Sequence, residues 1–165
     1  MMITLTGFMG SGKTTVGKVL ADFLGCPFLD LDDLVVKKAG KSIPDIFTQD
    51  GEPVFRQLEA QLLRKTIEKY AEGTAVLALG GGAVLAPGSA SLLHEKTVCI
   101  YLRVSLETIL QRLAGETAGR PLADDALASR LAEREPIYEK TAHVILDTDG
   151  LSPDEVADEI IISAL

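Results

Sequence analysis

The stretch GFMGSGKT, from Gly7 to Thr14, carries the pattern G-x-x-x-x-G-K-[ST] and decides the fold. It follows an apolar segment, MITLT at residues 2–6, and opens an amphipathic segment at residues 13–24, the strand–loop–helix context that the pattern requires. Glycines let the backbone form a nest of N–H groups for phosphate, and the helix N-terminus adds a positive dipole end. Lys13 can neutralise the β- and γ-phosphates, and the Thr14 hydroxyl can bind Mg²⁺. The stretch predicts a nucleoside triphosphate site formed by Gly10, Ser11, Gly12, Lys13, Thr14 and Thr15.

Apolar and amphipathic segments alternate along the rest of the chain. The expected strands are residues 2–6, 27–32, 75–79, 97–102 and 143–147, and the expected helices include residues 13–24, 53–70, 105–114 and 152–164. Gly25 is expected to end the first helix, and Ser105 and Ser152 stand at cap positions of later helices. This alternation predicts one α/β domain, with a mostly parallel sheet between two layers of helices. Ligands of such folds bind at the carboxyl ends of the strands.

The composition argues against several classes of partner. The chain has 16 Lys and Arg residues against 24 Asp and Glu residues, and its net charge of −8 repels nucleic acid and anionic lipid. No apolar run is long enough to span a bilayer and no signal peptide is recognisable, so a cytoplasmic protein is expected. Cys26 and Cys99 are expected to be buried apolar residues. His94 and His143 have no other metal ligand at suitable spacing, so no zinc site is expected.

The segment FLDLDD, at residues 28–33, ends an expected strand in three carboxylates. Asp30 and Asp32 alternate with leucines, so both are expected on one strand face, about 7 Å apart, at the edge where ligands bind. Asp30 is expected to hold Mg²⁺, and Asp32 to orient an acceptor hydroxyl and take its proton. Asp33 faces the other way and is expected in the first turn of a helix. The alternative for all three is helix capping and solvation.

Two arginines fall on otherwise apolar helix faces. Arg56 can pair with Glu59 one helical turn later, whereas Arg134 falls on a stripe formed by Leu131 and Tyr138. A buried charge without a partner is costly, so Arg134 must meet an acid, a phosphate or a bound anion. The functional hypothesis is that the two guanidinium groups bind a substrate carboxylate, and the alternative is an internal ion pair for each.

Two glycine-containing segments are further candidates for the site. Gly80, Gly81 and Gly82 directly follow an expected strand, where residues without side chains let a ligand lie against the backbone. Simple flexibility is the alternative for these glycines. Residues 115–125 are polar and contain Gly and Pro, which is typical of a mobile lid, and Arg120 could close from it onto the phosphates. The alternative for Arg120 is an exposed loop position.

Together these motifs resemble those of the shikimate kinase family. The resemblance runs from Ile3 to nearly the C-terminus and rests on GFMGSGKTTVGK, FLDLD, IFTQDGEPVFRQLE, LGGGAV, GRPL and LAEREPIYE, in the family's order and spacing. It implies a P-loop kinase fold, a three-layer sandwich whose five-stranded parallel sheet has the order 2-3-1-4-5. It also implies a single kinase domain over residues 1–165, with a substrate-binding helical segment at residues 31–62 and a lid at residues 114–126. The implied reaction transfers the ATP γ-phosphoryl group to the 3-hydroxyl of shikimate, giving shikimate 3-phosphate and ADP, on the route to chorismate and the aromatic amino acids.

The same resemblance implies roles for individual residues. The implied catalytic residues are Lys13, Asp32 and Arg120. The implied Mg²⁺ site comprises Thr14 and Asp30. The implied shikimate site comprises Asp32, Phe47, Phe55, Arg56, Gly80, Gly81, Gly82 and Arg134. The implied ATP site adds Arg112, Arg120 and the loop at residues 147–153 to the phosphate loop. The chain departs from the family at Val35 and Val36, where Ile-Glu is common, and at Leu79, where Thr is common.

Two rival functions remain open at the level of sequence. A pair of arginines suits any carboxylate, so the nearest rival is a kinase of another small hydroxy acid such as gluconate. A GTP-binding switch is the rival from a different class, because DTDG at residues 147–150 resembles D-x-x-G, although no N-K-x-D motif follows it. The expected partners are ATP, shikimate and Mg²⁺, without nucleic acid or membrane, and the expected state is a monomer.

Overall fold

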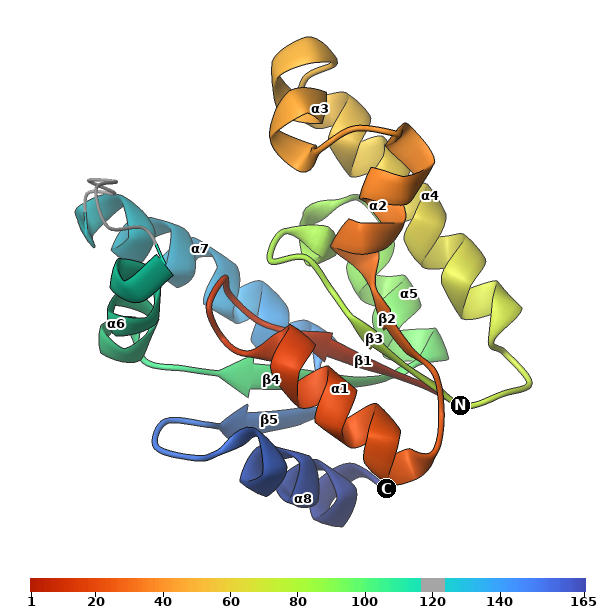
Figure 1. The fold of residues 1–165 in the computed structure, drawn as a ribbon, viewed down its shortest axis with the longest axis vertical. Coiled ribbons are helices and arrows are strands. Elements are labelled where there is room, and N and C mark those ends of the chain that lie inside the picture. The colour runs from red at the N-terminus through yellow and green to blue at the C-terminus, as the bar shows by residue number, and fades with distance from the viewer. Residues whose placement is uncertain (117–123) are drawn as a thin grey trace.

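The structure is a computed structural model, and it describes residues 1–116 and 124–165. One sheet forms its centre, and its strands are β1 (Met2–Thr6), β2 (Phe28–Asp30), β3 (Ala75–Ala78), β4 (Val98–Arg103) and β5 (Val144–Asp147). They lie in the order β2-β3-β1-β4-β5 with all four pairings parallel, as Figure 1 shows. The predicted α/β class and strand order are therefore confirmed, although most strands are shorter than predicted.

Helices connect the strands and cover the sheet. In the described residues they are α1 (Lys13–Leu24), α2 (Leu31–Ala39), α3 (Ile43–Gln49), α4 (Glu52–Lys69), the 3₁₀ turn η1 (Ala83–Leu85), α5 (Ser89–Lys96), α6 (Leu106–Glu116), α7 (Asp124–Thr141) and α8 (Pro153–Ala164). Helix α5 is an addition to the predicted helices, because its short sequence has only a weak amphipathic pattern.

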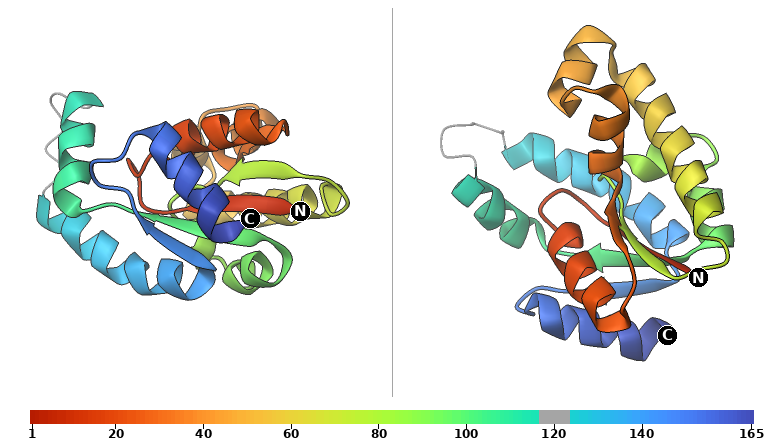
Figure 2. Two further views of the ribbon diagram at one scale, coloured as in Figure 1. Left: turned by 90° about the horizontal axis from the view of Figure 1, so that it is seen from below. Right: turned by 45° about the vertical axis from the view of Figure 1, so that its right-hand side comes forward.

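Alternate residues of the strands supply a core on each face of the sheet. On one face, Ile3 and Leu5 pack in a cluster with residues of α1 and α8. On the other face, Leu77 and Tyr101 pack in a cluster with residues of α4, α5 and α7. Figure 2 shows the sheet between these two layers. The period of two along each strand therefore produces the three-layer arrangement.

The chain leaves the sheet earlier than predicted in the acidic segment. Strand β2 ends at Asp30, whose Oδ1 atom accepts a hydrogen bond from the backbone N–H of Asp32 at 2.9 Å and caps α2. Asp32 and Asp33 lie in the first turn of α2, so the predicted position of Asp33 is confirmed. The prediction that the strand extends to Asp32, with two carboxylates on one strand face, is wrong. The alternation with leucines imitates a strand, but the capping interaction of Asp30 decides the backbone.

Other helix ends follow their local sequence. Gly25 ends α1 in the left-handed conformation with φ 61°, as predicted. The Ser152 hydroxyl accepts a hydrogen bond from the backbone N–H of Glu155 at 3.2 Å, and the Glu155 carboxylate accepts one from the Ser152 N–H at 2.7 Å. This reciprocal capping box fixes the start of α8 and confirms the predicted cap.

A few predictions concern residues outside the sheet edge where the site is expected. Cys99 is buried, but Cys26 is only partly buried, so the prediction of burial is wrong for Cys26, which lies in the turn between α1 and β2. His94 and His143 are exposed, and their rings stack with centroids 4.4 Å apart. None of the described helices combines the length and the apolar character that a membrane-crossing segment needs.

Candidate functional site

Three cavities adjoin one another along the carboxyl ends of the central strands. The α8 cavity, of about 400 Å³, is lined by Gly10, Ser11, Gly12, Thr15, Val16, Arg112, Thr148, Leu151, Pro153 and Val156. The central cavity, of about 290 Å³, is lined by Met9, Gly10, Gly12, Lys13, Thr14, Thr15, Asp30, Asp32, Leu79, Gly80 and Gly81. The α4–α7 cavity, of about 470 Å³, is lined by Met9, Asp32, Ile43, Phe47, Glu52, Phe55, Arg56, Glu59, Gly80, Gly81, Gly82, Arg130 and Arg134.

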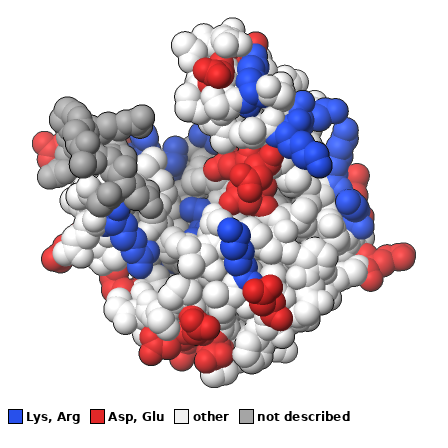
Figure 3. All heavy atoms as spheres, viewed as in Figure 1, with Lys and Arg blue, Asp and Glu red and all other residues white. Residues whose placement is uncertain are grey.

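Shared residues join these cavities into one line. Gly10, Gly12 and Thr15 line both the α8 cavity and the central cavity. Asp32 and Gly80 line both the central cavity and the α4–α7 cavity. In Figure 3 this face of the molecule is hollowed, and acidic atoms border the hollow where α2 begins. Two ligands bound in line would therefore meet at Asp32.

The phosphate loop lies between β1 and α1 and is held by its own lysine. The Lys13 ammonium donates hydrogen bonds to the backbone carbonyls of Gly7 and Phe8, each at 2.8 Å. Gly10 and Gly12 adopt positive φ values of 74° and 90°, which residues with a Cβ atom rarely adopt. The resulting loop turns around the N-terminus of α1, which is the geometry expected for phosphate binding.

The charge of Lys13 is held in an unfavourable environment. Burial lowers the pKa of Lys13 to about 8, while the carboxylates of Asp32 and Asp30 oppose the shift and Arg134 adds to it. A buried ammonium that is easily deprotonated gains most from an additional anion beside it. The lysine is therefore prepared for a ligand that carries negative charge.

Acidic and hydroxyl oxygen atoms line the central cavity beside Lys13. The Thr14 hydroxyl donates a hydrogen bond to Oδ2 of Asp30 at 2.8 Å, while Oδ1 of Asp30 caps α2. Burial raises the pKa of Asp32, the Asp30 carboxylate adds to the rise, and Lys13 opposes it. Asp32 is consequently a better proton acceptor than an ordinary surface aspartate.

In the α4–α7 cavity, Arg56 forms the ion pair that its spacing from Glu59 predicts. Its Nη1 atom lies 2.8 Å from Oε1 of Glu59, and its Nε atom lies 3.5 Å from the exposed Glu52. Glu59 is 1% exposed, and its Oε2 atom has no hydrogen-bond partner in the described part of the chain. Burial raises the pKa of Glu59, whereas the bond to Arg56 lowers it. The internal ion pair between Arg56 and Glu59 is therefore present, and Arg56 nevertheless lines the α4–α7 cavity.

The second predicted arginine, Arg134, differs from Arg56 in its surroundings. It comes from α7, and its guanidinium group lies over the ring of Phe8 with 5.8 Å to the ring centroid. It forms no ion pair with the acids of residues 1–116 and 124–165. Among the alternatives raised by the sequence, an internal ion pair therefore applies to Arg56 and not to Arg134. Arg134 lines the α4–α7 cavity without such an ion pair.

Close packing by neighbouring side chains explains two of the three glycines after β3, Gly80 and Gly82. A Cβ atom on Gly80 would lie 2.8 Å from Oδ1 of Asp32, and one on Gly82 would lie 2.6 Å from Cζ of Arg56. None of the three glycines has a positive φ, so backbone freedom does not explain them. The glycines let the carboxylate of Asp32 and the guanidinium of Arg56 lie against the backbone.

Tyr138 holds this glycine turn from the other side, a role that sequence reasoning missed. Its hydroxyl donates a hydrogen bond to the backbone carbonyl of Gly81, and its ring lies 5.0 Å from that of Tyr101. The only signal in the sequence is that Tyr138, whose side chain ends in a hydroxyl, falls on the apolar face of its helix. That signal cannot identify a partner 57 residues away. Two further predicted residues, Phe47 and Phe55, pack with ring centroids 4.9 Å apart at the cavity wall.

The α8 cavity is lined by residues to which the family resemblance assigns the adenine end of the nucleotide, Arg112 and part of the loop at residues 147–153. Arg112 of α6 donates a hydrogen bond to the backbone carbonyl of Gly10 at 2.8 Å, so α6 is tied to the phosphate loop. The Thr148 residue is 3% exposed and lines the cavity, and its hydroxyl has no hydrogen-bond partner in the described residues. An unpaired buried hydroxyl beside a cavity favours a polar ligand such as a base.

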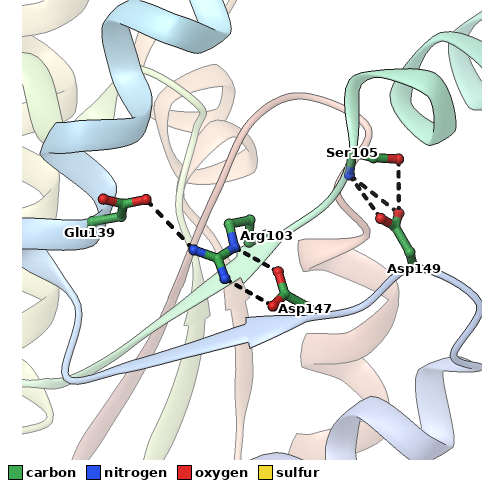
Figure 4. A network of polar contacts seen from close by, with 5 residues as sticks. All are labelled: Arg103, Ser105, Glu139, Asp147 and Asp149. Atoms are coloured by element: carbon green, nitrogen blue, oxygen red, sulfur yellow. Dashed lines mark hydrogen bonds and ion pairs between the residues drawn. The ribbon is translucent and has the colours of Figure 1, made fainter.

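A polar network fixes the loop that carries Thr148 (Figure 4). Arg103 donates two hydrogen bonds to the carboxylate of Asp147, at 2.6 and 2.8 Å, and lies 3.6 Å from Glu139 of α7. The carboxylate of Asp149 accepts hydrogen bonds from the backbone and the hydroxyl of Ser105 at 3.2 Å. The ends of β4 and β5 are thus joined, and the wall of the α8 cavity is held in place.

Arg120 and most of the predicted lid, residues 117–123, lie outside the described residues. The remaining predicted site residues come from segments between the end of β1 and α7, and they line the three adjoining cavities. No cluster of three or more His, Cys, Asp or Glu side chains suited to a metal ion occurs in the described part of the chain. A metal here would therefore depend on hydroxyl and phosphate oxygens as well as carboxylates.

Comparison with known proteins gives a consistent result. A family model described as shikimate kinase matches residues 9–164. The shikimate kinase of Enterococcus faecalis is 42% identical, over 96% of this chain and 95% of the relative, and that of Geobacter sulfurreducens is 45% identical, over 96% and 87%. Among solved structures, shikimate kinase from Acinetobacter baumannii in complex with shikimate has a TM-score of 0.88 and 34% identity, covering 97% of this chain and 90% of that one. With the P-loop kinase fold and the line of cavities, these matches place the chain in the shikimate kinase family.

Proposed function

We propose that the protein transfers the γ-phosphoryl group of ATP to the 3-hydroxyl of shikimate, giving shikimate 3-phosphate and ADP. The observation that carries the proposal is the single line of cavities, with the phosphate loop at one end, Asp32 at the junction and two guanidinium groups beyond it. Family membership supports the choice of acceptor, because the similar Acinetobacter baumannii enzyme is in complex with shikimate. The product belongs to the route toward chorismate and the aromatic amino acids.

The acceptor is proposed to bind in the α4–α7 cavity through its carboxylate. Arg56 and Arg134 both line this cavity, and Arg134 has no acid partner within the described ranges. Two planar guanidinium groups can bind a carboxylate through paired hydrogen bonds. Phe47 and Phe55 would border the ring, and the turn Gly80–Gly82 would lie against it. This anchoring directs the hydroxyl groups toward Asp32.

In the proposed reaction, a lone pair of the acceptor hydroxyl attacks the γ-phosphorus while the bond to the β-γ bridging oxygen breaks and ADP leaves. Asp32 accepts the hydrogen bond of the hydroxyl, orients it in line and takes its proton. Its raised pKa makes this transfer more favourable than for an ordinary aspartate. Lys13 holds the β- and γ-phosphates and offsets the charge on the moving group. Arg120 is proposed to add a positive charge from the lid at residues 114–126.

A magnesium ion fits the oxygen atoms of the central cavity. The Thr14 hydroxyl and the carboxylates of Asp30 and Asp32 line it, whereas Leu79 offers no oxygen atom from its side chain. Mg²⁺, when bound there, would offset the negative charge of the phosphates. Thr14 would ligate the ion directly, and Asp30, already bonded to Thr14, would orient that hydroxyl.

The nucleotide is proposed to extend from the phosphate loop into the α8 cavity. The backbone from Gly10 to Thr15 would bind the phosphates, while Arg112 and the loop at residues 147–153 would surround the adenine. A monomer in the cytoplasm, acting as one kinase domain with residues 31–62 as the acceptor-binding segment, remains the expected form. Sedimentation velocity would test the expected molecular mass of a monomer.

The proposed function is tested by measuring ADP release with ATP and Mg²⁺ in the presence of shikimate, gluconate or no acceptor. We expect rapid release with shikimate, with ³¹P NMR showing a phosphomonoester on the 3-oxygen, and only slow release otherwise. Replacing ATP by GTP should lower the rate. Comparable turnover of gluconate and shikimate, or a nucleotide hydrolysis that ignores the acceptor, would remove shikimate as the substrate.

A further inference from the structure

A fourth cavity lies outside the line of substrate cavities, between α4 and the start of α5. This α4–α5 cavity has a volume of about 540 Å³, which is within the usual range for small-molecule sites. Its walls come from α4 and from residues 86–92, which lead from η1 into α5. None of the substrate functions proposed above uses this cavity.

The lining combines an apolar surface with polar and charged side chains. The apolar part comes from Pro53, Ala60, Ala86, Pro87 and Leu92. Arg64 and Lys65 add two exposed cations, and neither forms an ion pair with an acid in residues 1–116 or 124–165. The other polar lining residues are Gln57, Gln61 and one acid, Glu68. Figure 3 shows Lys and Arg atoms gathered over the side where α4 lies. With Arg56, the lining carries three cations against the single carboxylate of Glu68, so in a chain with a net charge of −8 this cavity is locally complementary to an anion.

Ser89 provides a hydroxyl group in the same cavity. Ser89 lines the cavity, is 3% exposed and is the first residue of α5. Its hydroxyl makes no hydrogen bond with the residues that the structure describes, and it is not one of their fully buried unpaired atoms. The hydroxyl can therefore donate to or accept from a ligand atom in the cavity. The positive end of the α5 dipole at this residue favours an acceptor with negative charge.

We infer that the α4–α5 cavity is a second binding site, for a small carboxylate carried on an apolar ring. The apolar lining would bury the ring, and Arg64, Lys65 and Ser89 would bind the carboxylate. A bare inorganic anion would use the cations but leave the apolar lining exposed to water. A neutral ring would gain nothing from the charges of Arg64 and Lys65, which are exposed to water.

Arg56 connects this site to the acceptor site. Of the residues that line the α4–α5 cavity and the α4–α7 cavity in the described chain, Arg56 alone belongs to both. Its guanidinium group is positioned by Glu59 at 2.8 Å and packs against Gly82. A carboxylate in the outer cavity attracts Arg56 away from the acceptor, so the two ligands weaken each other's binding. This coupling, unlike the binding itself, rests on the proposed function.

The test uses benzoate as the probe and benzamide as a neutral molecule of the same shape, with calorimetric titration of the whole protein. We expect saturable binding of benzoate and much weaker binding of benzamide. The double variant Arg64→Gln, Lys65→Gln should bind benzoate about tenfold less tightly, as expected for the loss of charge-assisted hydrogen bonds. Lys69→Gln is the matched control, because Lys69 lies on the same helix but does not line the cavity. Melting curves establish that each variant is folded.

Arg134→Gln separates the two cavities, because Arg134 lines only the acceptor side. Benzoate affinity should survive this substitution. Loss of affinity in Arg134→Gln together with normal affinity in the double variant would show that benzoate occupies the acceptor cavity, and the inference would then be wrong. Equal affinity for benzamide, or no saturable binding at all, would also overturn it.

Kinetics test the coupling separately. Benzoate should raise the KM for shikimate in the native protein and in Lys69→Gln but not in the double variant, whose KM without benzoate should be unchanged. An equal rise in the double variant would overturn the coupling. A protein without activity toward shikimate would refute the proposed function, while calorimetry would still decide whether the cavity binds a carboxylate.

Discussion

The Arg56 guanidinium donates a hydrogen bond to Oε1 of Glu59 at 2.8 Å, inside the wall of the cavity that Asp32 also lines. Glu59 is almost fully buried, and its second oxygen has no hydrogen-bond partner in the described chain. One buried carboxylate therefore positions one of the two guanidinium groups that line the α4–α7 cavity. Arg134, the other one proposed to bind the acceptor, has no such ion pair in the described residues.

Replacing Glu59 by Gln tests this positioning role. The amide preserves the volume but loses the charge that orients Arg56, so the KM for shikimate should rise about tenfold, with kcat and the KM for ATP nearly unchanged. Steady-state kinetics provide the measurement. Glu52→Gln is the control, because Glu52 is exposed and lies 3.5 Å from Nε of Arg56. Equal effects of the two substitutions would contradict a special role for Glu59.

Gly82→Ala should displace Arg56 by direct contact. The added Cβ atom would lie 2.6 Å from Cζ of Arg56, and the flexible arginine can move more easily than the backbone. We expect the KM for shikimate to rise about tenfold, with little change in melting temperature, because a misplaced guanidinium loses one charge-assisted hydrogen bond. Gly73→Ala is the matched control, since an added Cβ there meets no atom within 4 Å. A fully active Gly82→Ala variant would refute the contact.

Asp32→Asn should separate binding from chemistry. The amide can still accept a hydrogen bond from the acceptor hydroxyl but cannot take its proton, so kcat should fall by about 100-fold or more. Shikimate affinity, measured by calorimetry, should change less than about threefold because the arginines remain. A parallel loss of affinity and kcat would instead indicate that Asp32 acts through acceptor binding.

The same variant has a predictable effect on stability. The pKa of Asp32 is raised in the folded protein, so the protonated form stabilises the fold, and this contribution is lost as pH rises through the folded pKa. At neutral pH, Asp32→Asn should therefore melt at a temperature equal to or higher than that of the native protein. The difference should shrink as pH falls below the ordinary carboxyl range. A variant that melts lower at neutral pH would contradict the direction of this shift.

ATP binding should take up a proton at mildly alkaline pH. Burial lowers the pKa of Lys13 to about 8, and the triphosphate should raise it again by favouring the ammonium form. At pH 8.5, roughly three-quarters of a proton should be absorbed on binding, measured by calorimetry in buffers of different ionisation enthalpy. Lys13→Arg is the control, because guanidinium remains charged at this pH and should abolish the uptake. Uptake that persists in Lys13→Arg would assign the proton to another group.

Local chemistry explains which parts of the fold could be predicted from the sequence. The phosphate loop, the cap at Ser152 and the spacing of Arg56 and Glu59 depend on residues within a few positions of one another, and all three appear as predicted. The prediction that β2 extends to Asp32 was wrong, and the reason is also local. Alternation over only a few residues fits a strand and a capped helix equally well, and the hydrogen bond to Asp32 decides between them.

Contacts between distant segments could not be predicted in the same way. Arg112 meets the carbonyl of Gly10 across 102 residues, and Tyr138 meets that of Gly81 across 57. The partner of each side chain depends on how the helices pack across the sheet, and no local sequence pattern predicts that packing. The glycine triplet lines the α4–α7 cavity, and its predicted contact with a ligand stays a prediction. No local pattern shows that the side chains of Asp32 and Arg56 lie against Gly80 and Gly82.

If the proposed function holds, the shared lining of the central cavity and the α4–α7 cavity has a practical consequence for inhibitor design. Because Asp32 and Gly80 belong to both cavities, a short tether could join a nucleoside polyphosphate to a carboxylated ring without passing through protein. Once one half of such a bisubstrate compound is bound, the other half is held at a high effective concentration beside its own cavity. Its affinity could then exceed that of either fragment by orders of magnitude.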